Sequence, residues 1–105
     1  MTNYRDRLRR LAVNEPHHVG AELGAISNLE PKLLAIAHLA SLIAVGASGP
    51  TFGEYADAAL SAGATCDEIV DVLVSVGPVV GMPRVVSAAG ELCQALGVDI
   101  DQSDE

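Results

Sequence analysis

Residues 58–83 constrain the fold of this chain more than any other part of its sequence. They join a helix rich in small residues to an apolar second helix through Gly63, which suits the left-handed position that ends a helix. Thr65 and Glu68 then have the spacing of a capping box, which satisfies free amides at the next helix start. Gly81-Met82-Pro83 breaks the second helix and begins another. The stretch therefore predicts a tight antiparallel helical hairpin.

Helix-start and helix-stop residues divide the rest of the chain in the same way. Asn3 can cap a first helix, Pro16 and Pro31 suit first helical positions, and Gly97 ends the last helix. The apolar spacing between them predicts helices at about residues 3–13, 16–27, 31–46, 50–62, 66–80 and 83–96. Only residues 70–80 are ambiguous with a strand, and there the capping box favours a helix. We expect an all-α protein, a compact bundle of about six helices.

Length and segment composition predict one domain in the cytoplasm. At 105 residues the chain can bury a core without disulfides or metals. We expect a helical domain over residues 1–98 and an acidic, disordered tail over residues 99–105. No secretory signal is visible. The longest apolar run, residues 33–47, is broken by His38 and Ser41 and falls short of the roughly 20 residues that span a bilayer.

Composition and charge indicate which partners to expect. Half of the residues are hydrophobic but only 3% are aromatic, so closely packed helices of small residues must build the core. The segment 33–46 is apolar nearly all round, which predicts a helix enclosed within the subunit or across an interface. After residue 10 the chain holds two basic and thirteen acidic residues, a balance that repels phosphate backbones. We therefore expect a homo-oligomer rather than a self-sufficient monomer, and no nucleic-acid partner.

The order of these helix signals resembles the carboxymuconolactone decarboxylase family. The similarity covers about residues 29–96, with Leu29-Glu30-Pro31-Lys32 at its start, then Gly63-Ala64-Thr65, Glu68 and Gly81-Met82-Pro83. It implies a compact helical bundle that assembles as a trimer or hexamer. It also implies acid–base chemistry on a small carboxylated or lactone-like metabolite, without a metal or organic cofactor. The related alkyl hydroperoxidase D-like proteins instead use a Cys-x-x-Cys motif for redox chemistry.

The residues that carry out this chemistry in the family differ in this chain. Tyr55 stands where the family has its histidine, in the helix before Gly63. Tyrosine is a poor general base at neutral pH, although it can donate a hydrogen bond to an oxyanion. No cysteine lies between residues 33 and 62, so the Cys-x-x-Cys motif is absent. Unmodified family catalysis is therefore not supported by the sequence.

His38 is the best available proton shuttle in the third predicted helix. Histidine changes its charge near neutral pH, and Ser41 lies on the same helix face, three residues further on. His38 and Tyr55 would act as proton-transfer or oxyanion groups, with Ser41 at the substrate. The alternative is a core histidine that hydrogen-bonds to a backbone carbonyl or to Tyr55.

Two charged residues complete the candidate site. Glu54 can supply an acid or an orienting carboxylate, unless it belongs to a solvated helix face. Arg84 follows Gly81-Met82-Pro83 and can bind a substrate carboxylate with two parallel hydrogen bonds. Its alternative role is an ion pair with an acidic neighbour.

The sequence gives weaker indications of a metal site or a reactive thiol than of the candidate site around His38. His17 and His18 are adjacent and point to different helix faces, so they make a poor metal site, and we expect no metal. Cys66 begins a helix, where the dipole favours a thiolate, but neighbouring acidic residues oppose it. Cys66 and Cys93 are expected to be free thiols.

Three functions follow from these residues. The first is a cofactor-independent decarboxylase, lyase or isomerase that uses His38, Tyr55 and Glu54, with Arg84 and Ser41 at the substrate. The second is a non-catalytic oligomer on the same scaffold that binds a ligand or serves only as structure. The third, with the least support, is a thiol-dependent peroxidase.

Overall fold

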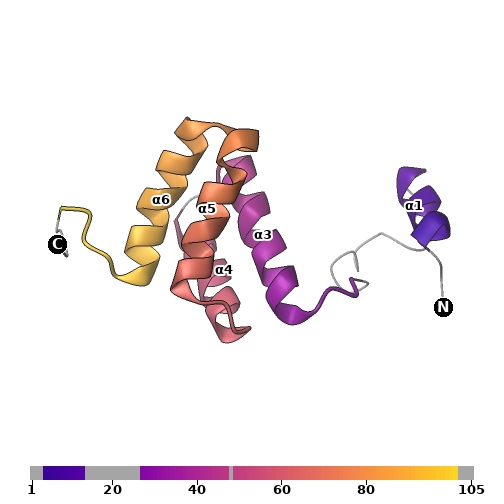
Figure 1. Cartoon of the computed structure of the whole chain (residues 1–105), viewed down its shortest axis with the longest axis horizontal. Helices are drawn as coiled ribbons and strands as arrows, with labels where there is room; N and C mark the ends of the chain where they lie inside the picture. The colour runs from indigo at the N-terminus through magenta and orange to yellow at the C-terminus, as the bar shows by residue number, and fades with distance from the viewer. Residues whose placement is uncertain (1–3, 14–26, 48, 102–105) are drawn as a thin grey trace.

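Every regular element in the computed structural model is an α-helix, over the described residues 4–13, 27–47 and 49–101. With the labels of Figure 1, the helices are α1 (Tyr4–Ala12), α3 (Pro31–Val45), α4 (Pro50–Ser61), α5 (Cys66–Val80) and α6 (Met82–Leu96). The all-α class is confirmed, with five helices in these ranges where the sequence predicts about six. The helix expected from Pro16 lies outside the described residues, and so does most of the predicted acidic tail.

Helices α3 to α6 pack as a four-helix bundle (Figure 1). Both α3 and α6 pack chiefly against α4 and α5, so α4 and α5 occupy opposite corners of the bundle. The turn between them forms as predicted, with Gly63 at a φ of +102°. The two helices of the predicted hairpin are therefore joined tightly, but each packs mainly on other helices.

Capping side chains begin α3 and α5. The Thr65 hydroxyl accepts a hydrogen bond from the Glu68 amide at 3.0 Å, and the Glu68 carboxylate accepts one from the Thr65 amide at 2.9 Å. The Glu30 carboxylate accepts from the Leu33 amide at 2.9 Å. These bonds satisfy amides that have no partner within their own helix, and they confirm the predicted capping box.

Two carboxylates connect helices that are distant in sequence. Glu68 also pairs with the Lys32 ammonium at 2.7 Å, so the starts of α3 and α5 lie together and these helices run parallel (Figure 1). The Glu91 carboxylate of α6 accepts a hydrogen bond from the Gly49 amide at 2.9 Å, at the start of α4. An anion is favourable at a helix N-terminus, so Glu91 stabilises the start of a helix that has no capping side chain of its own.

Alanine supplies five of the twelve buried core residues in the described part of the chain, in line with the small-residue composition. Four larger side chains are fully buried among them: Phe52, Leu39, Ile43 and Ile69. The buried alanines come from α3, α4, α6 and the α4–α5 turn: Ala35, Ala56, Ala59, Ala64 and Ala88.

Of the two surroundings predicted for α3, full enclosure within one subunit is not found, and enclosure across an interface stays a prediction. Within one chain the buried residues of α3 form a single stripe, Ala35, Leu39 and Ile43. Leu33 and Val45 are largely exposed. Because the helix is apolar nearly all round, burial of one stripe leaves apolar surface facing outward.

Helix α1 stands apart from the bundle (Figure 1). It has no buried residue, and within the described residues it makes no contact with α3 to α6. None of the described helices has the length and hydropathy needed to cross a membrane.

We predict that Thr65→Ala lowers the free energy of unfolding by about 1 kcal/mol, because the Glu68 amide loses its acceptor. Thr51→Ala is the matched control, since Thr51 is exposed near the start of α4, a helix with no side-chain cap. Urea denaturation compares the two midpoints at an unchanged slope. Equal losses in both variants would contradict the role of the capping box.

We also predict that the contribution of Glu68 to stability depends on pH. The Lys32 ammonium and the Thr65 amide hold the pKa of the Glu68 carboxyl below its usual value of 4.5. The lower folded pKa means that the carboxylate stabilises the fold above pH 4.5, and that this contribution is lost as the pH falls through the folded pKa. The gap in urea midpoint between wild type and Glu68→Gln should therefore be widest at neutral pH and close in acid. A gap that does not change with pH would refute this assignment.

Candidate functional site

His38 and Tyr55 contact each other across the α3–α4 interface. Their ring centroids lie 5.4 Å apart and the ring planes meet at 84°, an edge-to-face arrangement. His38 is half-buried, and 37% of Tyr55 is exposed. The pair predicted from the sequence is therefore brought together through a ring contact, and solvent reaches the tyrosine.

The other residues predicted near His38 face elsewhere. The Ser41 hydroxyl donates a hydrogen bond to the Ala37 carbonyl at 2.8 Å, within α3 itself. Such a bond satisfies the hydroxyl locally. Glu54 is exposed beside Tyr55 on α4. The structure thus holds the His38–Tyr55 pair without drawing Ser41 or Glu54 into a hydrogen bond with it.

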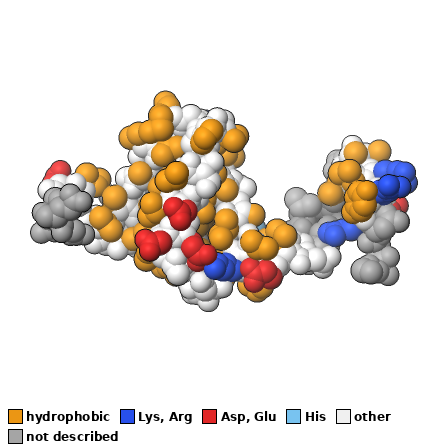
Figure 2. Space-filling view, in the orientation of Figure 1, with side chains coloured by type: hydrophobic (Ala, Val, Ile, Leu, Met, Phe, Trp, Pro, Cys, Tyr) orange, Lys and Arg blue, Asp and Glu red, His pale blue; other side chains and the backbone are white. Residues whose placement is uncertain are grey.

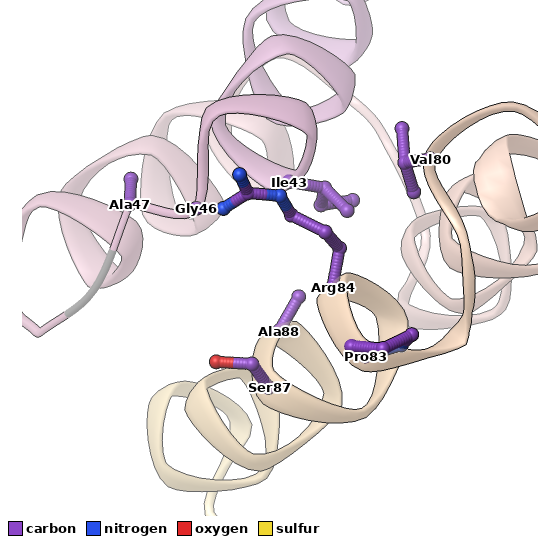
Figure 3. A pocket seen from close by; sticks show the side chains of 8 residues that line it. All are labelled: Ile43, Gly46, Ala47, Val80, Pro83, Arg84, Ser87 and Ala88. Atoms are coloured by element: carbon purple, nitrogen blue, oxygen red, sulfur yellow. The ribbon is translucent and has the colours of Figure 1, made fainter.

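Arg84 lies in a cavity of about 440 Å³ between the C-terminal ends of α3 and α5 and the start of α6 (Figure 3). Its guanidinium crosses directly over Gly46, and a Cβ at Gly46 would collide with the guanidinium nitrogen. Gly46 also has a φ of +77°, the left-handed conformation that ends α3. The cavity is lined by Ile43, Gly46, Ala47, Val80, Pro83, Arg84, Ser87 and Ala88.

The guanidinium of Arg84 has no carboxylate within ion-pair distance among the described residues. The ion pair that the sequence offered as its alternative role is therefore not formed with any of them. The guanidinium lies instead at the C-terminal end of α3, where the helix dipole favours a cation. Ser87 follows three residues later and places its hydroxyl on the same cavity wall.

The His38–Tyr55 pair and Arg84 are separate features. Neither His38 nor Tyr55 lines the Arg84 cavity. Along α3, His38 precedes Gly46 by eight residues, about 12 Å of helix rise. A small ligand held at Arg84 is therefore not placed against the predicted proton shuttle.

Sequence reasoning missed Gly46 and Ser87 as parts of this cavity. The spacing from Arg84 to Ser87 was a usable signal, because residues three apart share a helix face. From the sequence, Gly46 could be recognised only as the residue that ends a helix. Its place under the guanidinium depends on how α6 crosses α3.

A second hollow, about 380 Å³, lies between α3 and α5. Its apolar residues are Ile36 and Ala40 from α3, with Val72 and Val76 from α5. Its polar residues are all on α5: Glu68, Asp71 and Ser75. We call these seven residues the α3–α5 groove.

Metal and thiol candidates give no organised centre. Within the described residues, no group of three or more His, Cys, Asp or Glu side chains is placed to hold a metal ion. His17 and His18 lie outside the described residues. Cys66 is exposed, Cys93 is half-buried, and both are free thiols, as expected from the sequence.

Comparison with known proteins finds no matching family model, no similar curated protein and no similar solved structure.

The close approach of Arg84 to Gly46 gives a sharp prediction. Gly97 provides the control, because it ends α6 in the same left-handed conformation (φ +70°) with nothing near its missing Cβ. Gly97→Ala should cost about 1–2 kcal/mol of stability from the backbone alone. Gly46→Ala should cost more, because it also displaces the guanidinium.

If the additional stability loss in Gly46→Ala comes from the collision with the guanidinium, it should disappear when Arg84 is also replaced by alanine. Thermal denaturation of Gly46→Ala, Arg84→Ala and the double variant completes the cycle. We expect the stability loss of the double variant to equal the loss of Arg84→Ala plus the loss of Gly97→Ala. Strictly additive losses would mean that the two residues do not interact.

Proposed function

We propose that this chain binds a small organic carboxylate in the Arg84 cavity. The observation that carries the proposal is a guanidinium with no carboxylate partner among the described residues, in a chain with thirteen acidic residues after residue 10. A guanidinium binds a carboxylate with two parallel hydrogen bonds. The ligand therefore supplies the negative charge that the neighbouring described side chains do not.

The remaining walls favour a short ligand with an apolar body. Ile43, Val80 and Ala88 provide apolar surface beside the guanidinium, and Ser87 provides one hydroxyl. A volume of about 440 Å³ lies within the range of small-molecule sites. Arg84 is exposed, so a ligand can reach it from solvent. The carboxylate competes with the end of α3 for the guanidinium, which favours modest affinity.

The scaffold is part of the proposal. We place the chain with carboxymuconolactone decarboxylase-like proteins, on the helix signals at residues 29–32, 63–68 and 81–83. On this basis it assembles as a homo-oligomer, a trimer or hexamer. Support comes from large apolar side chains on the surface of a single chain, such as Val79 at 87% and Val86 at 64% exposure.

The His38–Tyr55 contact favours a second function, a cofactor-independent lyase, decarboxylase or isomerase. The two rings are close enough to act on one substrate, with His38 moving a proton and Tyr55 donating to an oxyanion. Glu54 is the nearby carboxylate of this scheme. If turnover of an identified substrate survives both His38→Ala and Tyr55→Phe unchanged, the enzymatic function is refuted.

Carboxylate binding is tested by titrating isotope-labelled protein with butyrate and recording amide chemical shifts. The uncharged butyramide is the matched ligand control. We expect butyrate to shift the amides of Gly46, Ser87 and Ala88, and butyramide to leave them in place. Arg84→Gln should weaken butyrate binding about tenfold or more, because a hydrogen bond to a charged group contributes about 1.5–3 kcal/mol. Arg9→Gln removes a charge outside the cavity and should leave binding unchanged.

Equal affinity of wild type and Arg84→Gln would refute the proposal. So would equal shifts from butyrate and butyramide, because the site would then not recognise charge.

A further inference from the structure

Helix α1 presents an apolar stripe that no other described helix covers. Tyr4, Leu8 and Leu11 share one face by their spacing, and they are 70%, 62% and 49% exposed. An isolated helix of nine residues is marginal in water, since most helices are stabilised by packing of an apolar face. The stripe of α1 would be stabilised by a complementary surface, which it does not contact on the described helices α3 to α6.

The charges of α1 restrict what that surface can be. The helix has four arginines and one acid, Asp6. At 100° per residue, Arg5 and Arg7 lie on the two sides of the Tyr4–Leu8–Leu11 stripe. A complementary surface is apolar at its centre and acidic at its edge.

The α3–α5 groove has both properties. Its floor combines Ile36 and Ala40 with Val72 and Val76, and its α5 edge has Glu68 and Asp71. Figure 2 shows acidic side chains gathered beside apolar ones on this face of the bundle. Lys32 already pairs with Glu68, whereas Asp71 has no cation within ion-pair distance among the described residues.

We propose that α1 of one chain docks in the α3–α5 groove of a second copy, and that the second copy returns the same contact. Tyr4, Leu8 and Leu11 pack on the apolar floor, and of the two flanking arginines, Arg5 and Arg7, the one on the α5 side approaches the acidic edge. A second copy is the occupant because α1 stands away from its own bundle and contacts none of its helices. This contact is independent of the Arg84 cavity, whose residues it does not use.

Complementary charge reversal distinguishes docking between chains from docking within one chain. One variant carries Arg5→Glu with Arg7→Glu, and the other carries Asp71→Lys with Ser75→Lys. When either variant associates with itself, like charges face each other at both contacts and repel. In an equimolar mixture, the reversed α1 meets the reversed groove and the native α1 meets the native groove. Full-length chains are used, and circular dichroism checks that each variant keeps its helices.

The readout is mass by sedimentation velocity at low salt, where charge screening is weakest. We expect wild type to sediment well above the 10.8 kDa of one chain. Each variant should fall toward that mass, and the mixture should recover the wild-type mass. Leu8→Ser should also lower the mass, whereas Ile100→Ser, at an exposed position after the end of α6 and outside the groove, should leave it unchanged.

Three results would overturn the proposal. Wild type at 10.8 kDa at every concentration means that α1 does not join two copies. Variants that keep the wild-type mass mean that the association uses another surface. A mixture that stays at the single-chain mass means that α1 and the groove are not partners.

Discussion

The Glu68 carboxylate joins the starts of α3 and α5, the two helices that line both hollows of this bundle. One oxygen accepts from the Thr65 amide and starts α5, and the other pairs with Lys32 at the start of α3. A single side chain therefore caps one helix and aligns it with another. Because α3 and α5 begin together and run in the same direction, the groove lies along their length and the Arg84 cavity lies at their far ends.

A core in which alanine is the commonest residue leaves this bundle with hollows and exposed apolar surface. Five of the twelve buried core residues that the structure describes are alanine, and Phe52 is the one aromatic residue among the twelve. Small side chains let the helices approach closely, but they cover little of the surface between neighbouring helices. The same composition that permits the fold thus leaves a groove for another helix and a cavity for a small ligand.

The local parts of the fold could be predicted from the sequence, because they depend on residues close together in the chain. Thr65 with Glu68 and the glycine at residue 63 are such signals, and their geometry is confirmed. The packing of whole helices could not be predicted in this way. Val70, Val72 and Val74 are equally apolar in the sequence, yet only Val72 is buried, and Val70 and Val74 are exposed. Which face turns inward depends on α4 and α5 occupying opposite corners.

The candidate site was likewise predictable only in part. His38 and Tyr55 were predictable as partners, and they meet through their rings. The position of Arg84 over Gly46 and the hydrogen bond between Glu91 and Gly49 depend on helix crossing, which the sequence pattern does not encode.

A crystal structure of the protein grown with butyrate tests the central claim, carboxylate binding at Arg84, most directly. We predict a carboxylate within hydrogen-bond distance of the Arg84 guanidinium, between the end of α3 and the start of α6. An Arg84 that remains against α3, with butyrate bound elsewhere or absent, would contradict it.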